Sequence, residues 1–180
     1  MLRRRDIDHI LRAAAALSGH AHFVMVGTGA VIATVRHIPL AMMMTEEIDI
    51  YVEDAADPEW ISDLIDATIG RYSQFHRTFG YYGDGVSQRT AVMPLGWRSR
   101  TVEYATPDGL ATALCPSAED IAIAKLCAWR EKDQAWLREV FRSGIAKAAK
   151  VADLLGSPLP DAAPAADELV RRLGVATAPG

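Results

Sequence analysis

Cysteine is scarce in this sequence, and histidine forms no motif. Only two of the 180 residues are cysteines, Cys115 and Cys127, and they stand too far apart to form a metal-binding pair. The five histidines also lack the spacing of metal ligands. We therefore expect neither a disulfide framework nor a zinc site, and the reduced thiols indicate a cytoplasmic protein.

Long apolar runs are missing as well. No stretch approaches the roughly 18 apolar residues that a membrane-spanning helix needs. The basic opening over residues 1–5 resembles the start of a signal peptide, but Asp6 and Asp8 interrupt the apolar segment that would have to follow it. The sequence therefore predicts neither membrane insertion nor secretion.

The chain has no excess of positive charge. Its formal net charge is −4, so the molecule has no overall field that attracts nucleic acid, although a local basic patch is compatible with this value. Half of the residues are apolar and 23% are charged, which suits one soluble core. We predict a domain over residues 1–155, followed over residues 156–180 by a linker, a short helix and a flexible tail.

Hydrophobic spacing predicts alternating helices and strands in the first half. Apolar residues recur at helical intervals from about Asp6 to Gly19 and again over residues 58–69. Residues 22–26 indicate a buried strand, and a turn at residues 27–29 leads into a helix that starts at Ala30. Residues 47–52 alternate polar and apolar side chains, the pattern of a strand with one packed face.

The second half combines short strands with longer helices. Gly- and Pro-rich turns at residues 83–85, 94–96 and 107–109 indicate two or three short antiparallel strands between Tyr81 and Leu114. A capping-box-like start at Ser117 predicts one long helix to about Ser143, and a further helix follows to Leu155. The whole pattern is that of an α/β fold with a C-terminal helical extension.

Two carboxylates in the alternating strand are candidate metal ligands. Glu47 and Asp49 project from one face of that strand, with α-carbons roughly 6.5–7 Å apart. Oxygen ligands at this spacing suit Mg²⁺ or Mn²⁺, which normally also hold water and substrate phosphates. The alternative is a polar strand face in solvent. Glu103, in the strand expected over residues 101–105, is a candidate third carboxylate or an exposed one.

A glycine turn and a lysine complete the set of candidates. Gly27, Thr28 and Gly29 lie between a strand and a helix, where backbone amides favour anions and glycines let a phosphate approach. The alternative is a close turn without a ligand. Lys125 lies in an otherwise apolar helix and requires an anionic partner, unless its stem only covers apolar surface. Asp133 is about 80° around a continuous helix from it.

Taken together, these segments resemble three successive motifs of the nucleotidyltransferase-like superfamily. The motifs are residues 26–30, 45–50 and 119–133, and the resemblance covers about residues 20–140. The chain is most similar to a small bacterial branch that is related to AbiEii-type toxins of toxin–antitoxin systems and includes DUF6036-like proteins. The resemblance implies a mixed sheet flanked by helices. The chain departs from the family pattern by lacking the serine of the glycine motif and by having Glu47 where aspartate is commoner.

The resemblance also implies a role for each motif. The glycine motif binds nucleotide phosphates, the two acids are catalytic and hold the metal, and the third motif supplies nucleotide contacts and two catalytic residues. The matching residues are Gly27, Thr28 and Gly29 for the phosphates, Glu47 and Asp49 for the metal, Lys125 and Asp133 for catalysis, and Lys125, Arg130 and Lys132 for nucleotide contacts.

The implied activity is metal-dependent transfer of a nucleotide. A nucleoside triphosphate would be the substrate, Mg²⁺ or Mn²⁺ the cofactor, and an RNA end, particularly of tRNA, or a protein hydroxyl the acceptor, within a toxin–antitoxin system. Two alternatives remain open. One is a catalytically silent module that binds a nucleotide or a partner protein, and the other is an interaction protein whose residues 42–44 and terminal helices form a homo-oligomer interface.

Overall fold

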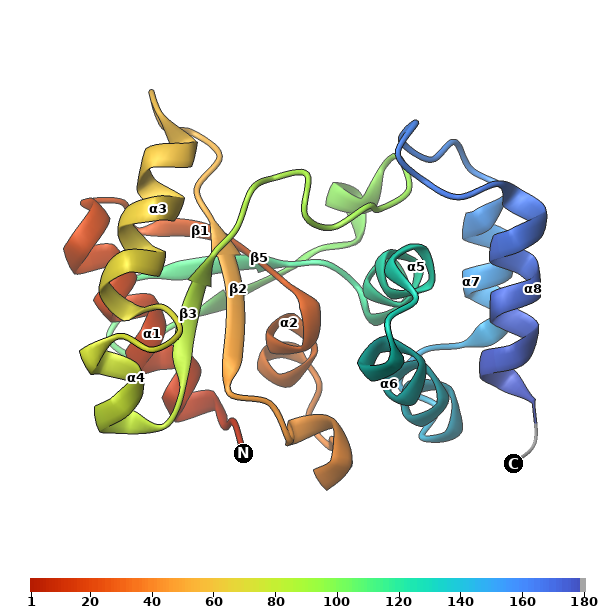
Figure 1. The fold of residues 1–180 in the computed structure, drawn as a ribbon, viewed down its shortest axis with the longest axis horizontal. Helices are drawn as coiled ribbons and strands as arrows, with labels where there is room; N and C mark the ends of the chain where they lie inside the picture. Colours follow the sequence, from red (N-terminus) through yellow and green to blue (C-terminus); the bar gives the residue numbers. More distant parts are fainter. Residues whose placement is uncertain (179–180) are drawn as a thin grey trace.

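The computed structural model describes residues 1–178 and has a mixed five-stranded sheet at its centre (Figure 1). The strand order is β3-β2-β1-β5-β4. The β2–β1 and β5–β4 pairs are antiparallel, whereas β1–β5 and β2–β3 are parallel. The strands are β1 (His22–Val26), β2 (Glu47–Tyr51), β3 (Tyr82–Gly85), β4 (Val102–Ala105) and β5 (Thr112–Cys115). This architecture confirms the predicted mixed α/β fold.

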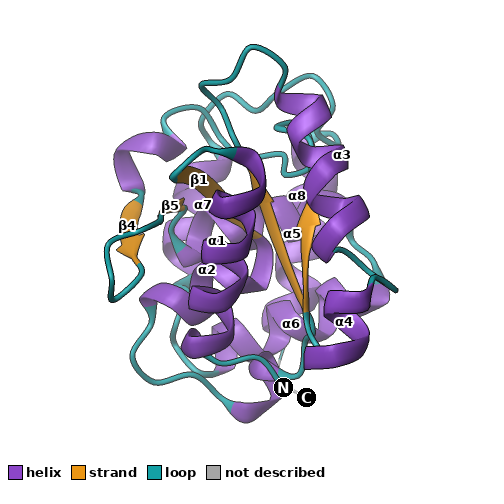
Figure 2. Ribbon diagram, turned by 90° about the vertical axis from the view of Figure 1, so that its left-hand side faces the viewer, coloured by secondary structure: helices purple, strands orange, loops and turns teal. Residues whose placement is uncertain are grey.

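Helices α1, α2 and α3 pack on the same face of this sheet. Gly83 of β3 faces Ile10 and Ile69, and its register partner Ile48 faces Gly29 of α2. The C-terminal helices form a further layer beyond α2 (Figure 1). Figure 2 shows β4 at one edge of the sheet. The helices are α1 (Arg4–Ser18), α2 (Gly27–Thr34), α3 (Pro58–Ile69), α4 (Gln74–Phe79), α5 (Ala118–Ala128), α6 (Glu131–Arg142), α7 (Ala148–Leu155) and α8 (Ala166–Thr177), with short 3-10 turns η1 (Leu40–Met43) and η2 (Trp97–Arg100).

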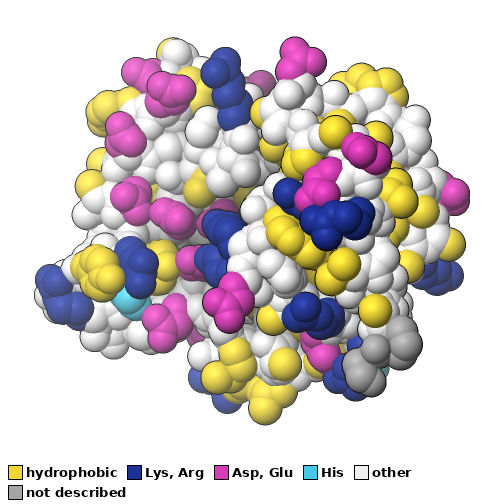
Figure 3. Space-filling view, turned by 45° about the vertical axis from the view of Figure 1, so that its right-hand side comes forward, with side chains coloured by type: hydrophobic (Ala, Val, Ile, Leu, Met, Phe, Trp, Pro, Cys, Tyr) yellow, Lys and Arg dark blue, Asp and Glu magenta, His cyan; other side chains and the backbone are white. Residues whose placement is uncertain are grey.

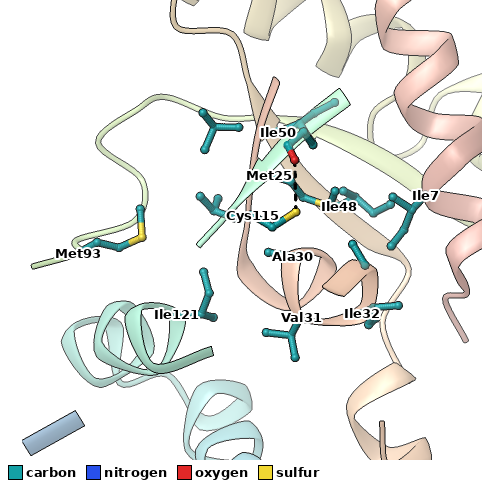
Figure 4. Close-up of a cluster of buried hydrophobic side chains, with 14 of the residues drawn as sticks. Ile7, Met25, Ala30, Val31, Ile32, Ile48, Ile50, Met93, Cys115 and Ile121 are labelled. Carbon is teal, nitrogen blue, oxygen red and sulfur yellow. Dashed lines mark hydrogen bonds between the residues drawn. The ribbon is translucent and has the colours of Figure 1, made fainter. Parts of the chain in front are cut away.

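The hydrophobic core lies between the sheet and these helices. Apolar side chains of β1 and β2 are buried against α2, and Ile121 of α5 joins them from the helical layer (Figure 4). Cys115 is wholly buried in the same cluster, and its burial raises the pKa of the thiol to about 12. Both cysteines are free thiols.

The third strand corrects the sequence interpretation of residues 83–85. Instead of a turn between antiparallel strands, Gly83 and Gly85 belong to β3, which is parallel to β2. A Cβ atom on Gly83 would lie 2.9 Å from Cγ2 of Ile10, and one on Gly85 would lie 2.0 Å from the carbonyl oxygen of Ser62. The glycines are therefore needed for close packing of α1 and α3 on this strand.

The predicted long helix over residues 117–143 is also wrong, because it is two helices. Trp129 has a left-handed backbone (φ 52°) and ends α5, and Arg130 is extended before α6 begins. Asp133 then accepts a hydrogen bond from the backbone N–H of Arg130 (3.3 Å). The chain consequently turns a corner at residues 129–130, and the angular positions expected for one helix do not apply.

The C-terminal helix α8 packs into the helical layer. Leu169, Leu173 and Ala176 are buried, and α8 contacts α5, α6 and α7. The proposed division at residue 155 stays a prediction, and the last two residues of the expected tail lie outside the described part of the chain. Over residues 1–178, no helix is long and apolar enough to span a membrane.

Candidate active site

A cleft of about 180 Å³ lies where α2, β2, β3 and the α5–α6 corner meet. Its polar lining residues are Gly27, Thr28, Glu47, Asp49, Asp84, Thr90, Lys125, Arg130 and Lys132. Acidic and basic side chains also lie side by side around a hollow in the surface shown in Figure 3. The structure thus brings residues of all three motifs into one cleft, while their roles stay predictions.

The glycine motif forms the first turn of α2. The helix begins at Gly27, so the expected start at Ala30 is three residues too late. Gly27 has φ +66°, and a Cβ atom there would lie 2.5 Å from Oδ2 of Asp49. Gly29 instead faces the sheet, where its Cβ would lie 3.1 Å from both Ile48 and Met25. Gly27 therefore makes room for the Asp49 carboxylate, and Gly29 does not line the cleft.

Glu47 lies at the start of β2 and is hydrogen-bonded on both oxygens. Lys132 Nζ donates to Oε1 (2.8 Å), and the Tyr82 hydroxyl donates to Oε2 (2.9 Å). Burial acts to raise the pKa of Glu47, but the hydrogen bonds from Lys132 and Tyr82 outweigh it, and the pKa lies below its ordinary value. Glu47 is therefore ionised at neutral pH.

Asp49 and Asp84 form a pair of carboxylates across neighbouring strands. They are register partners in the parallel β2–β3 pair. Burial, together with the charges of Glu47 and Asp84, raises the pKa of Asp49 to about 7. Burial, and then the neighbouring Asp66, raises the pKa of Asp84 to about 6. The negative charges in this cleft thus oppose one another, and a cation placed among them would relieve the repulsion.

Asp84, which the sequence interpretation assigned to a turn, occupies the place expected for Glu103. Glu103 is exposed on β4, three strands away from β2, and lines a separate cavity with His20 and His22. One signal for Asp84 is present in the sequence, because Tyr82, Asp84 and Val86 alternate with glycines as in a strand.

Hard-cation chemistry fits the oxygen donors of this cleft. Within residues 1–178, no group of three or more His, Cys, Asp or Glu side chains is arranged as a complete metal site. Mg²⁺ does not require such a cage, because it commonly binds one or two carboxylates and completes its shell with water and substrate phosphates. Glu47 and Asp49 meet that requirement.

Lys125 and Asp133 form a buried ion pair beside the cleft. Lys125 Nζ lies 2.9 Å from Oδ1 of Asp133, whose side chain is fully buried, and Arg130 Nε donates to Oδ2 (2.7 Å). Burial acts to raise the pKa of Asp133, but the hydrogen bond from Arg130 and the charge of Lys125 lower it below its ordinary value. Asp133 does not line the cleft, so it positions the two cations that do.

Helix α8 supports the corner that carries these cations. Arg172 donates from Nη1 to the carbonyl oxygens of Leu126 (2.7 Å) and Cys127 (3.0 Å), the last turn of α5. Its guanidinium lies 5.4 Å from the ring centroid of Trp129, and Glu168 accepts from its Nε (2.7 Å). The left-handed residue is thus stabilised by a helix distant in sequence.

We expect Arg172→Ala to destabilise the protein by about 1–3 kcal/mol, because it leaves carbonyl groups at the end of α5 without their donor. Urea unfolding of this variant gives the free energy. Arg171→Ala is the matched control, since Arg171 also binds Glu168 but is exposed, and it should change stability by less than about 0.5 kcal/mol. Equal losses in both variants would contradict a support role for Arg172.

Comparison with known proteins identifies a family. Residues 5–154 match the model of a family described as nucleotidyltransferase of unknown function (DUF6036). No curated protein and no solved structure matches the chain. The matched segment contains every polar residue of the cleft, whereas α8 lies outside it, and the match does not test the closer relation to AbiEii-type toxins. The chain therefore belongs to the DUF6036 family of nucleotidyltransferases of unknown function.

Proposed function

We propose that this protein is a metal-dependent nucleotidyltransferase that uses a nucleoside triphosphate and transfers the nucleotide to a hydroxyl of RNA, tRNA in particular, or of a protein. The observation that carries this proposal is that carboxylates and cationic side chains lie together in one cleft. The carboxylates of Glu47, Asp49 and Asp84 line it together with the cations of Lys125, Arg130 and Lys132. Carboxylates suit a hard cation, and the basic side chains suit the phosphates that it would bind.

Glu47 and Asp49, with Asp84 beside them, are the residues that would hold Mg²⁺ or Mn²⁺. The raised pKa values of the two aspartates support this assignment, because burial and then neighbouring carboxylates disfavour their ionised forms, which a bound cation would favour. The ion would supply neutralisation of phosphate charge and polarisation of the phosphorus–oxygen bonds.

The residues of the chain have separate tasks in this proposal. Lys125, held by Asp133, neutralises charge on the triphosphate, and Lys132 exchanges its bond to Glu47 for one to a phosphate oxygen. Gly27 makes room for the Asp49 carboxylate, and Thr28, the next residue of α2, lines the cleft where a phosphate would bind. The acceptor oxygen bonds to the α-phosphorus, the bond to pyrophosphate breaks, and a cleft carboxylate takes the hydroxyl proton.

A silent module is the second candidate function. The glycine motif has Thr28 and no serine, and Lys132 already occupies one oxygen of Glu47, so nucleotide binding without transfer is compatible with the site.

The alternative of an interaction protein is favoured by exposed apolar side chains near residues 42–44, since Leu40 is 64% and Met44 69% exposed. Such side chains suit a partner protein or a second copy of the chain.

Labelled nucleotides decide between transfer and binding. We expect incubation with each α-labelled nucleoside triphosphate, Mg²⁺ or Mn²⁺ and total RNA, or a protein extract, to give a labelled macromolecule, and EDTA to abolish it. The RNA and protein fractions identify the acceptor class. Binding without any labelled product in either fraction would support the silent module instead.

A further inference from the structure

A second cavity of about 270 Å³ adjoins the cleft. It shares Thr28, Glu47, Lys125 and Lys132 with the cleft, so the Lys132–Glu47 ion pair lies at the boundary between the two. We call it the methionine chamber, and its remaining lining residues are Ala41, Met42, Met44, Thr45, Ala135, Trp136 and Glu139. These remaining residues belong to η1, to the segments that flank η1, and to α6.

We propose that the methionine chamber binds the nucleoside part, the base and ribose, of the nucleotide whose phosphates occupy the cleft. This inference rests on the function proposed above and deepens it by dividing the substrate between two compartments. The cleft alone, at about 180 Å³, lies below the roughly 300–1,000 Å³ of typical small-molecule sites. With the chamber added, the combined space falls within that range.

The charges assign the phosphates to the cleft. Asp49 and Asp84 line only the cleft, so the cation that they attract, and the phosphates bound to it, belong there. Lys125 and Lys132 line both cavities and are placed to contact phosphate at the boundary. The α-phosphate joins the triphosphate to the ribose, so a nucleotide bound in this direction places its nucleoside in the methionine chamber.

The side chains of the chamber suit a flat ring. Met42, Met44 and Trp136 are large and apolar, and thioethers make favourable contacts with aromatic rings. Trp136 is 7% exposed, and its indole N–H is a buried donor for which the described residues provide no hydrogen-bond partner. Such a donor is costly to leave unpaired, and an acceptor atom of a base or ribose that reached it would satisfy it.

The boundary between the two cavities is easy to open. The side chains of Lys132 and Glu47 are 58% and 31% exposed, and ion pairs in such positions contribute little to stability. A phosphate oxygen is an equivalent partner for the ammonium group, so Lys132 loses no ion pair when it leaves Glu47. Nucleotide binding therefore joins the cleft and the chamber without rearrangement of the fold.

Filling the chamber tests the inference. Ala135 is an exposed residue of α6 that lines only this cavity, so Ala135→Phe occupies the chamber from a position that tolerates a larger side chain. We expect this variant to bind each nucleoside triphosphate at least tenfold more weakly with Mg²⁺, while inorganic triphosphate binds as in wild type. Calorimetry gives both dissociation constants. Ala152→Phe, at an exposed position of α7 that lines neither cavity, is the matched control.

Inorganic triphosphate separates this inference from the proposed function. If wild type binds nucleoside triphosphates no more tightly than inorganic triphosphate, or if Ala135→Phe weakens both ligands equally, the chamber assignment is wrong and the proposed function stands. If wild type binds neither ligand with Mg²⁺, both fail. Ala41→Phe, which enters the chamber from η1, gives the same test if Ala135→Phe does not fold.

Discussion

Asp49→Asn is expected to lower metal-dependent nucleotide transfer by about 10³-fold or more while the fold is retained. An amide keeps the shape of the carboxylate but loses the charge that makes it a ligand for a hard cation. A bound ion contributes several kcal/mol of charge stabilisation, and each 1.36 kcal/mol corresponds to about tenfold in rate. The labelled-nucleotide assay measures this loss. Glu103→Gln, which removes an exposed carboxylate far from the cleft, should transfer at the wild-type rate.

Asp49→Asn is also expected to stabilise the metal-free protein. The pKa of Asp49 rises from an ordinary value of 3.8 to about 7 on folding, so the native state binds a proton that the unfolded chain has lost in that interval. The stability of the metal-free wild type should therefore decrease as pH rises from about 4 to 7. Asp49→Asn removes this penalty, and we expect the variant to be about 1–2 kcal/mol more stable at pH 8, after allowance for solvent screening.

Urea unfolding at pH 8 and near pH 4 measures this difference. The advantage of Asp49→Asn should shrink toward the lower pH, where the carboxyl group is protonated in the native wild type. Mg²⁺ with nucleotide should stabilise the wild type and leave the variant unchanged. If the variant is less stable at pH 8, by about 1–3 kcal/mol, Asp49 instead serves a structural hydrogen bond or ion pair.

Local patterns in the sequence predicted much of the cleft. The alternation in residues 47–52 places Glu47 and Asp49 on one face of β2, and the order strand, glycine turn, helix places Gly27 between β1 and α2, although α2 begins three residues earlier than expected. Each of these features depends on the residues of one strand or one turn. Such periodicity can be recognised in a single sequence because side-chain direction follows the backbone directly.

The missed features depend on contacts between distant segments. Asp84 was assigned to a turn because glycines surround it, whereas Gly83 and Gly85 are required by the packing of α1 and α3. No local pattern states that a helix will lie on these residues, nor that β3 will pair parallel to β2. The sequence therefore favours Glu103 as the third carboxylate, although the sheet order separates this residue from the cleft.

The corner between α5 and α6 could not be predicted for a similar reason. Residues 117–143 have a helical pattern throughout, and tryptophan is an unusual residue for a left-handed helix end. The donor that satisfies the exposed carbonyls of α5 is Arg172, from a helix that begins at Ala166. The angle of 80° between Lys125 and Asp133 applies only to a helix without this break, so the sequence does not predict their direct ion pair.

Gly27→Ala is expected to lower transfer by at least about 100-fold and to destabilise the protein. Two costs combine at this position. The residue has φ +66°, where an L side chain costs roughly 1–2 kcal/mol, and the added Cβ would lie 2.5 Å from Oδ2 of Asp49. The carboxylate must move, and displacement of a reacting group by about 1 Å is enough for a 100-fold loss of rate.

Gly109→Ala separates the two costs in Gly27→Ala. Gly109 has φ +70°, but nothing lies within 4 Å of the Cβ that alanine would add, so this control measures backbone strain alone. We expect Gly27→Ala to lose about 1–3 kcal/mol more than Gly109→Ala in urea unfolding, which is the usual range for an overpacked contact.

A double-mutant cycle assigns the excess to Asp49. In an Asp49→Ala background the carboxylate that Gly27→Ala would strike is absent, so the penalty of Gly27→Ala should fall to that of Gly109→Ala. The coupling energy then reports the contact between residue 27 and the Asp49 side chain. An unchanged penalty in that background would place the carboxylate away from the start of α2, and Gly27 would have no role in accommodating it.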